Sequence, residues 1–274
     1  PHAFWALSGN GMTNTLSCEP QADACADGCA ITCNSLRPLF RLSSEYELVL
    51  ASGSPRRRQF LNEWGLPFRL ALAEAEEPRP MPGESPEAYT RRAAIAKALA
   101  VGQNLLPNPA LPHATGAALL PVILAADTVV AIDGDILGKP HSPAHALSML
   151  ERLSGASHEV ISAVCLLLPP QCGGIPAASA LPELNVQDTV QGDFRMLSFS
   201  DVSRVYFHHW PQPVLQAYVD TGEPNDKAGA YAIQGQGAVL VERVEGSWST
   251  VVGLPVTPLA QVMISLGIMQ PYGA

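Results

Sequence analysis

The chain has 274 residues, of which 47% are apolar and only 15% charged, so it can build a large hydrophobic core and is not disordered throughout. Its 25 acidic residues outnumber its 16 basic ones, and the formal net charge of −9 argues against broad binding to a nucleic-acid backbone. No stretch approaches the ~20 consecutive apolar residues that a membrane-spanning helix needs. We therefore expect a folded protein whose partners include neither nucleic acid nor membrane.

Residues 1–44 show little hydrophobic periodicity and lack the basic start and apolar centre of a secretory signal. They hold four of the six cysteines, Cys18, Cys25, Cys29 and Cys33. This spacing does not match the paired C-x2-C pattern of common zinc sites. In a helix the last three would share one face, which could suit a metal, but incidental thiols are the more usual explanation. We predict that residues 1–44 are a poorly ordered, Cys-containing extension.

From Glu47 onward, apolar strand patterns alternate with amphipathic helix patterns, as is typical of α/β proteins. The expected elements of the first half are a strand over 47–52, a helix within 53–65, a strand over 67–73, a helix from Ser85 and Pro86, a strand over 121–130, and a helix over 142–155. In the second half we expect a strand over 158–168, a strand over 196–207, a helix over 211–222, a hairpin pairing 237–246 with 248–255, and a helix over 257–267. Residues 169–193 have no period and read as an inserted surface loop.

The turn between the first strand and the first helix has the sequence Ser52-Gly53-Ser54-Pro55-Arg56-Arg57. Backbone N–H groups at a helix start favour an anion, the two serine hydroxyls can donate hydrogen bonds, and guanidinium groups bind phosphate oxygens in bidentate fashion. A capped helix with solvated arginines explains the same residues about equally well. The turn is not a Walker P-loop, because the chain has no G-x4-G-K-[ST] pattern.

Asp127 follows five apolar residues, and we expect it at the end of the apolar strand predicted within 121–130. A carboxylate in such a place must be hydrogen-bonded, paired or bound to a cation, and the carboxyl ends of strands commonly line a ligand crevice. A turn-capping aspartate is the alternative. Lys139, which follows a Gly-containing turn twelve residues later, could return to the same crevice.

Residues 222–235 are rich in small side chains, so a backbone there can approach a ligand closely, with Lys227 and Gln234 as the polar groups within reach. The chain has thirteen Arg but only three Lys, and two of those three lie in the segments described so far. A compact ammonium is not interchangeable with a guanidinium where space is tight. This placement supports a ligand site, although chance could also produce it.

Glu74, Glu76 and Glu77 lie in a Pro-flanked loop, and one of them could join Asp127 in holding a hard cation such as Mg²⁺. A solvated acidic loop is the more usual explanation for any one of them. The chain contains neither a G-x-S-x-G elbow nor an H-E-x-x-H pattern, which argues against a serine hydrolase and against zinc catalysis.

Four blocks in this order resemble the Maf family of nucleoside triphosphate pyrophosphatases, the septum-formation inhibitor-like proteins. The blocks are LASGSPRRRQFL, AADTVVAIDGDILGKP, LSGASHEVISAV and DKAGAYAIQGQGAVLVERVEGSWSTVVGLP, and the resemblance covers residues 47–267. It implies a two-lobed α/β fold with a central mixed twisted sheet, flanking helices and a nucleotide cleft between the lobes. On this basis we expect a pyrophosphatase domain over 45–270, with 169–193 inserted in it.

The resemblance also implies hydrolysis of a nucleoside triphosphate to the monophosphate and pyrophosphate, dependent on Mg²⁺ or Mn²⁺, by a cytoplasmic homodimer. Its DKAGAY-IQG block resembles the branch that acts on dTTP, UTP and related, possibly modified, pyrimidine nucleotides. The alternatives are a 7-methyl-GTP pyrophosphatase of the same family and a nucleotide-binding regulator of cell division with little catalysis.

Carried over position by position, the resemblance assigns catalysis to Asp127, Lys97 and Lys139, and metal binding to Asp127 with Glu76. The predicted substrate-binding residues, from the resemblance and from the segments above, are Ser52, Ser54, Arg56, Arg57, Thr128, Lys227 and Gln234. Among these, Thr128 and Gln234 match positions that contact the base. Ala232 and the Ser249-Thr250 pair depart from the commoner family residues and could adjust the fit of the base.

Overall fold

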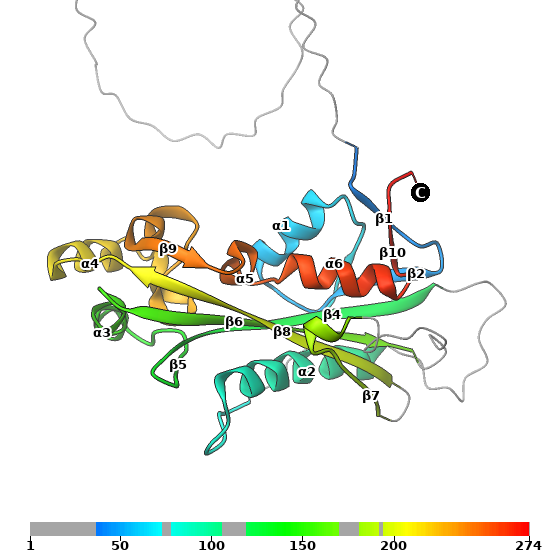
Figure 1. Ribbon diagram of the computed structural model, residues 1–274, viewed down its shortest axis with the longest axis horizontal. Helices are drawn as coiled ribbons and strands as arrows, with labels where there is room; N and C mark the ends of the chain where they lie inside the picture. Colours follow the sequence, from blue (N-terminus) through cyan, green and yellow to red (C-terminus); the bar gives the residue numbers. More distant parts are fainter. Residues whose placement is uncertain (1–36, 73–77, 106–118, 170–180, 192–193, 274) are drawn as a thin grey trace, which may run out of the picture. The chain divides into compact units, whose positions relative to one another are not determined.

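The computed structural model describes residues 37–72, 78–105, 119–169, 181–191 and 194–273. Their main feature is a mixed eight-stranded sheet with helices on both faces (Figure 1). The predicted α/β class, with a central mixed sheet flanked by helices, is thereby confirmed. Within these ranges no helix has the length and apolar character needed to cross a membrane.

Eight strands form the main sheet in the order β3-β2-β4-β6-β8-β7, with β5 paired to β4 and β9 paired to β8. Their bounds are β2 Tyr46–Leu50, β3 Arg69–Leu70, β4 Leu120–Ile132, β5 Asp135–Leu137, β6 Ser157–Leu168, β7 Gln187–Gln191, β8 Phe194–Phe207 and β9 Val241–Glu245. The two strands next to β2 run parallel to it, and all other pairs are antiparallel. Strands β1 (Phe40–Leu42) and β10 (Met269–Pro271) form a separate antiparallel pair.

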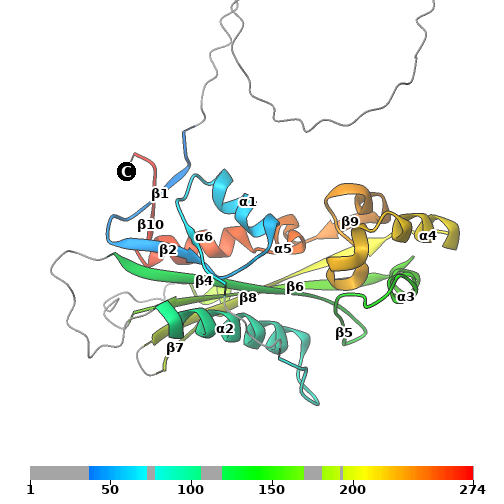
Figure 2. The ribbon, with the colours of Figure 1, turned by 180° about the vertical axis from the view of Figure 1, so that it is seen from behind.

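The strand period of two sends alternate side chains to opposite faces, and each face acquires its own helices. On one face Leu48 and Leu50 pack with α1 (Pro55–Glu63) and α6 (Val256–Ser265). On the other face Val49 packs with α2 (Pro86–Leu105). The views in Figures 1 and 2 agree that α2 lies across the sheet from α1, α6 and α5 (Trp248–Val252).

A third group of helices packs near the far end of β4, β6 and β8. It comprises α3 (Pro143–Leu153), α4 (Gln212–Asp220) and the 3-10 helices η2 (Glu223–Asp226), η3 (Ala228–Ala230) and η4 (Gly235–Leu240). Their apolar side chains share a core with Val130, Val160 and Val205, which lie on the same sheet face as Leu48 and Leu50. The sheet face that carries α1 and α6 thus carries a second core further along the strands.

Proline and serine set the helix starts as the sequence predicts. Proline is compatible with the first helical turn because its missing N–H would be unsatisfied there. It occupies the first position of α1, α2 and α3. The hydroxyl oxygen of Ser85 accepts a hydrogen bond from the N–H of Ala88, and that of Ser142 accepts one from the N–H of His145.

Strands β2 and β4 diverge partway along β4, and their divergence creates the space for a site. Their pairing ends where Leu50 lies opposite Leu124, and β2 then turns away into α1. Strand β4 continues for eight more residues, to Ile132, so Asp127 lies within the strand and not at its end as predicted. Over 125–129 it pairs with β6 on one edge, while its other edge has no strand partner among the described residues until β5 begins.

The structure corrects three expectations. Residues 248–252 form helix α5 and β9 pairs with β8, so the predicted hairpin between 237–246 and 248–255 is wrong. Five residues are too few to distinguish a strand period from a helical one, and the helical turn buries Ser249 and Thr250 against the sheet. Part of the predicted loop 169–193 instead forms η1 (Pro182–Leu184) and β7. Strand β1 falls inside the predicted extension 1–44, of which residues 1–36 lie outside the described residues.

Candidate active site

A cleft of about 890 Å³ opens where β2 and β4 diverge. It is lined by segments that are far apart in the sequence, including the turn before α1, one side of α2, the exposed part of β4, η3 and the end of α5. All ten described residues of the predicted site line it: Ser52, Ser54, Arg56, Arg57, Lys97, Asp127, Thr128, Lys139, Lys227 and Gln234. The predicted metal ligand Glu76, with Glu74 and Glu77, lies outside the described residues.

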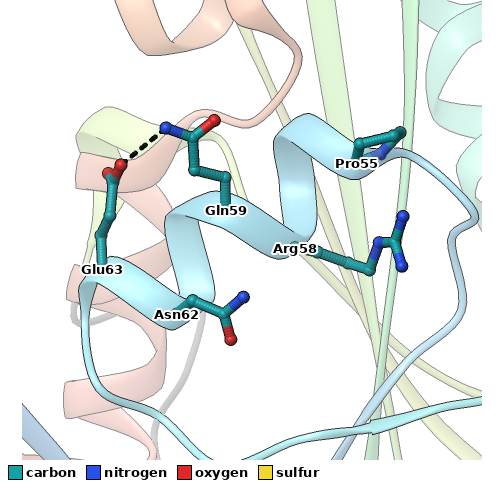
Figure 3. A pocket seen from close by; sticks show the side chains of 5 residues that line it. All are labelled: Pro55, Arg58, Gln59, Asn62 and Glu63. Carbon is teal, nitrogen blue, oxygen red and sulfur yellow. Dashed lines mark hydrogen bonds between the residues drawn. The ribbon is translucent and has the colours of Figure 1, made fainter. Parts of the chain in front are cut away.

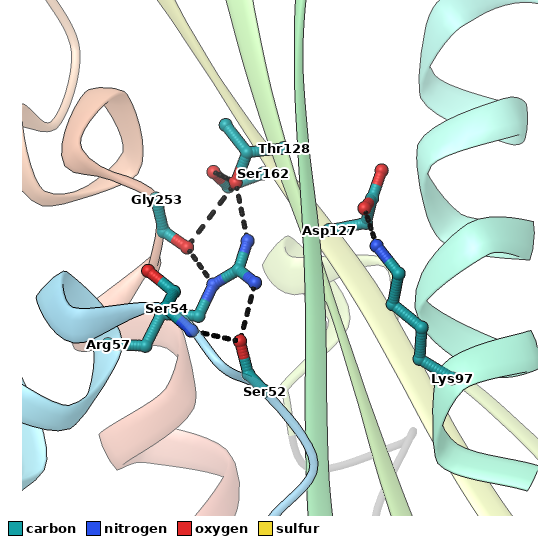
Figure 4. A network of polar contacts seen from close by, with 8 residues as sticks. All are labelled: Ser52, Ser54, Arg57, Lys97, Asp127, Thr128, Ser162 and Gly253. Carbon is teal, nitrogen blue, oxygen red and sulfur yellow. Dashed lines mark hydrogen bonds and ion pairs between the residues drawn. The ribbon is translucent and has the colours of Figure 1, made fainter. Parts of the chain in front are cut away.

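Neighbouring residues of β4 divide the cleft into two walls, because successive strand side chains point to opposite faces of a sheet. Asp127 points toward α2, where it meets Lys97, and Figure 4 shows this pair on the other side of β4 from Thr128. We call Tyr89, Lys97 and Asp127 the α2 wall. We call Ser52, Arg57, Thr128 and Gly253 the α1–α5 wall.

The guanidinium group of Arg57 joins the α1–α5 wall together. It donates hydrogen bonds to the carbonyl oxygen of Gly253 at 2.8 Å, to the hydroxyl of Ser52 at 3.0 Å and to the hydroxyl of Thr128 at 3.0 Å (Figure 4). Burial lowers the pKa of Arg57 to about 10, and the charge of Asp127 opposes that shift. Arg57 therefore stays cationic at neutral pH although its contacts in this wall are all with neutral groups.

A series of hydrogen bonds between hydroxyl groups continues from Arg57 into the sheet, and the donor of each bond can be assigned. The hydroxyl of Ser162 donates its proton to the carbonyl oxygen of Thr250 at 2.8 Å, so it must accept the 2.8 Å bond from Thr128. Thr128 in turn accepts from Arg57. Because Thr128 donates its one hydrogen bond to Ser162, its hydroxyl oxygen can only accept a hydrogen bond from a bound base.

Arg56 differs from Arg57 in leaving most of its guanidinium free. Its Nε donates to the carbonyl oxygen of Val252 at 3.1 Å, while its terminal NH₂ groups make no hydrogen bond or ion pair to any described residue. The side chain is half-buried and lines the cleft. The predicted phosphate contact thus suits Arg56 well, whereas Arg57 lies within the wall itself.

On the α2 wall, Asp127 is 5% exposed and forms an ion pair with Lys97 through Oδ1. The Lys97 side chain is 31% exposed. The second oxygen, Oδ2, makes no hydrogen bond to any residue in the described ranges. This wall consequently holds a nearly buried carboxylate with one oxygen available and a cation beside it that reaches solvent.

Three further predicted residues, Lys139, Lys227 and Gln234, also line the cleft. Lys139 is exposed and has no ion-pair partner in the part of the chain that the structure describes, whereas Lys227 pairs with Asp226. Gln234 is half-buried at the start of η4. Gly229 shows why this segment needs small residues, because its φ is +67° and a Cβ there would lie 2.8 Å from Val130.

Several residues in or behind the cleft are absent from the sequence prediction. Ser162, which lies behind Thr128 and not in the lining of the cleft, could have been found as the one hydroxyl in the predicted strand over 158–168, and Tyr231 lies in one of the four blocks but received no role. The Tyr231 hydroxyl lies 2.8 Å from Nε2 of His158, whose pKa burial lowers to about 4. Tyr89 and Arg79 also line the cleft, and neither has a sequence pattern that would single it out.

A second hollow, of about 300 Å³, lies on the outer side of α1 (Figure 3). It is lined by Pro55, Arg58, Gln59, Asn62 and Glu63, and Gln59 donates a 2.8 Å hydrogen bond to Glu63 across it. None of the predicted site residues lines this hollow. The candidate active site is therefore the larger cleft.

Comparison with known proteins finds the same family that the four sequence blocks resemble. A family model described as "Maf-like protein" matches residues 47–266. A dTTP/UTP pyrophosphatase of Oleidesulfovibrio alaskensis is 47% identical over 227 residues, which cover 83% of this chain and 88% of that protein. Proteins with the same name from Nitratidesulfovibrio vulgaris and Methylococcus capsulatus are 45% and 41% identical, over 82% of this chain and over 90% and 94% of their own lengths.

Proposed function

The chain belongs to the Maf-like protein family, and from that premise we propose that it is a nucleoside triphosphate pyrophosphatase acting on dTTP and UTP. The products are the nucleoside monophosphate and pyrophosphate. The relatives at 41–47% identity carry this activity in their names. The observation that carries the proposal is the composition of the cleft.

Six basic side chains line the cleft, namely Arg56, Arg57, Arg79, Lys97, Lys139 and Lys227. Among the residues that the structure describes, two carboxylates accompany them, Asp127 and Asp226. A nucleoside triphosphate carries about four negative charges near neutral pH, which matches this excess of positive charge. The chain as a whole is acidic, so the concentration of cations in one cleft supports a polyanionic substrate.

A divalent cation such as Mg²⁺ or Mn²⁺ fits the donor set. Among the described residues no group of three His, Cys, Asp or Glu side chains could hold a metal by itself. Mg²⁺, however, is usually bound by one or two carboxylates together with waters and substrate phosphates. Asp127 offers the free oxygen Oδ2, and Glu76 stays a prediction as a second ligand. Once bound, the cation would neutralise developing charge on the phosphate oxygens.

The described residues then divide the work of the reaction. The start of α1, Arg56 and Lys139 bind the phosphate chain. Asp127 holds a water molecule and accepts its proton as that water attacks the α-phosphorus, while Lys97 keeps the carboxylate oriented. Pyrophosphate leaves against cations that are already in place, so catalysis depends on positioning and electrostatic stabilisation. Thr128 and Gln234 contact the base.

Release of pyrophosphate tests this proposal directly. Purified protein with Mg²⁺ should release pyrophosphate from dTTP and UTP in a coupled assay, with kcat/KM for 7-methyl-GTP at least ~10-fold lower. Faster turnover of 7-methyl-GTP than of dTTP and UTP would assign the chain to the 7-methyl-GTP branch of the family. Nucleotide binding without pyrophosphate release would instead favour the cell-division regulator.

Three further parts of the proposal rest on the family resemblance. We expect the catalytic domain to extend over 45–270 together with β1, which pairs with β10, and we expect 169–193 to be an insertion that contributes η1 and β7. We also expect a homodimer in solution, which size-exclusion chromatography with light scattering would test. A cytoplasmic location is likewise part of the proposal.

A further inference from the structure

We propose that Arg79 is a substrate-binding residue at the rim of the cleft, held in place by an ion-pair clamp that fastens its loop to α2. The inference rests on the proposed function, because it assigns Arg79 to the same triphosphate. We call residues 78–84 the rim loop. Arg79 lines the cleft together with its neighbours Pro78 and Pro80.

The guanidinium of Arg79 is exposed and makes no hydrogen bond or ion pair with any residue that the structure describes. Its backbone carbonyl oxygen, in contrast, is occupied by a 2.9 Å hydrogen bond from Arg92 on α2. The backbone is thus fixed while the charged end of the side chain stays free. A planar guanidinium in this state is suited to bidentate contact with phosphate oxygens.

The clamp consists of Arg92 and Glu84. Arg92 donates to both carboxylate oxygens of Glu84, at 2.7 and 2.6 Å, and the same carboxylate accepts the N–H of Met81 at 3.0 Å. The Glu84 side chain is only 7% exposed. The hydrogen bonds from Arg92 lower the pKa of Glu84 to about 2, so the clamp stays charged throughout the neutral range.

Two features reduce the freedom that Arg79 would lose on binding a phosphate. The prolines at 78 and 80 restrict the backbone on either side, and the clamp fixes the loop against α2. Preorganised groups bind more tightly because less conformational entropy is lost on binding. Arg92 also lies 5.6 Å from the ring centre of Tyr89, a residue of the α2 wall. The clamp therefore connects the rim loop to the wall that holds Asp127.

Substitution of Arg79 by Gln tests the inference. We expect KM for dTTP, and Kd for its non-hydrolysable α,β-methylene analogue measured by calorimetry, to rise about 5–10-fold, with kcat within about 2-fold. Arg79→Lys should restore part of the affinity. Arg41→Gln, which makes the same charge change at an exposed position on β1 outside the cleft, is the matched control and should leave both constants unchanged. Unchanged Kd in Arg79→Gln would overturn the inference.

A double-mutant comparison tests the clamp. Glu84→Gln should raise KM in the same direction by about 2–5-fold, and the double variant Arg79→Gln, Glu84→Gln should match Arg79→Gln alone. Additive effects would show that the clamp does not act through Arg79. The analogue separates the two proposals, because wild-type protein that binds it through Arg79 yet releases no pyrophosphate contradicts only the proposed function.

Discussion

The two walls of the cleft satisfy their polar groups in different ways. In the α1–α5 wall, the Arg57 guanidinium donates three hydrogen bonds within the protein, and the Thr128 hydroxyl donates its one hydrogen bond to Ser162. In the α2 wall, Asp127 pairs with Lys97 through one oxygen, and its other oxygen bonds to none of the residues that the structure describes. The first wall is thus finished, since these hydrogen bonds form when the chain folds. The second wall is open, because the carboxylate of Asp127 keeps an oxygen that can bond to a ligand.

This difference separates stability from chemistry within one cleft. A buried guanidinium that loses its acceptors, or acceptors that lose their donor, destabilises the fold. A carboxylate that faces the cleft contributes little to folding but changes the reaction when it is altered. Substitutions in the α1–α5 wall should therefore act mainly on unfolding, and those in the α2 wall mainly on turnover.

The largest effect is expected for Asp127→Asn, which keeps the shape of the side chain and removes its charge. Turnover of dTTP should fall by about 10³-fold or more, because the proposed proton acceptor and metal ligand is lost. The midpoint of thermal unfolding should change little. Steady-state kinetics and a thermal melt measure both quantities.

Asp226→Asn is the matched control, since it removes a second carboxylate that lines the same cleft. The Asp226 side chain is 76% exposed and pairs with Lys227, whereas the Asp127 side chain is 7% exposed. We expect at most a few-fold change in kcat/KM for the control. Equal losses in the two variants would remove the special role of Asp127 and with it the contrast between the walls.

The α1–α5 wall is tested by Arg57→Met, which keeps much of the side-chain volume but removes the three hydrogen bonds that Arg57 donates. The acceptors on Ser52, Thr128 and Gly253 would lose their partner in a buried place, so the free energy of unfolding should fall by about 3 kcal/mol or more. Denaturant titration measures this change. Arg56→Met, which alters a half-buried side chain with one backbone contact, should change stability far less and KM more.

The opposite result would reverse the assignment of the two arginines. If Arg57→Met unfolds like the wild type but no longer binds the α,β-methylene analogue of dTTP, Arg57 contacts the phosphates directly. The α1–α5 wall would then be a ligand surface like its counterpart, and the distinction between a finished wall and an open one would fail.

The sequence predicts the elements that surround the cleft because strong patterns define them. The apolar run before Asp127 and the proline-led helix starts required no knowledge of tertiary contacts. The pairing of Lys97 with Asp127 could not be found in this way, because α2 and β4 meet only when the sheet is assembled. The strand period does imply that Asp127 and Thr128 face opposite ways, a consequence that divides the cleft into two walls.

Two other features were out of reach for physical reasons. Helix α5 is five residues long, too short for its period to show, and the alternation in GSWSTVV is equally compatible with a strand. Arg79 lies in a Pro-rich loop without periodicity, and contacts with Arg92 on α2, which lies 13 residues further along the chain, help to fix its place. Short helices and loop positions depend on distant partners that local sequence does not encode.

The smallest predicted effect concerns pH and the support behind the α1–α5 wall. His158 lies on the same face of β6 as Ser162, is 2% exposed and contacts the Tyr231 hydroxyl through Nε2. Burial lowers the pKa of His158 to about 4 in the folded protein, whereas an unfolded chain takes up the proton near its ordinary value of about 6.5. The stability that comes from keeping His158 neutral is therefore fully present above pH 6.5 and is lost as the pH falls toward 4.

When the pH falls from 7 to 5, the unfolding free energy should decrease by about 2 kcal/mol because of His158 alone. Denaturant titrations of the wild type and of His158→Gln at both pH values isolate the effect, because all other titrating groups are common to the two proteins. The amide can still bond to Tyr231, so the variant should fold, and its stability should decline less on acidification. Parallel pH profiles would mean that His158 takes up its proton in the folded state, and that the core behind the α1–α5 wall is open to water.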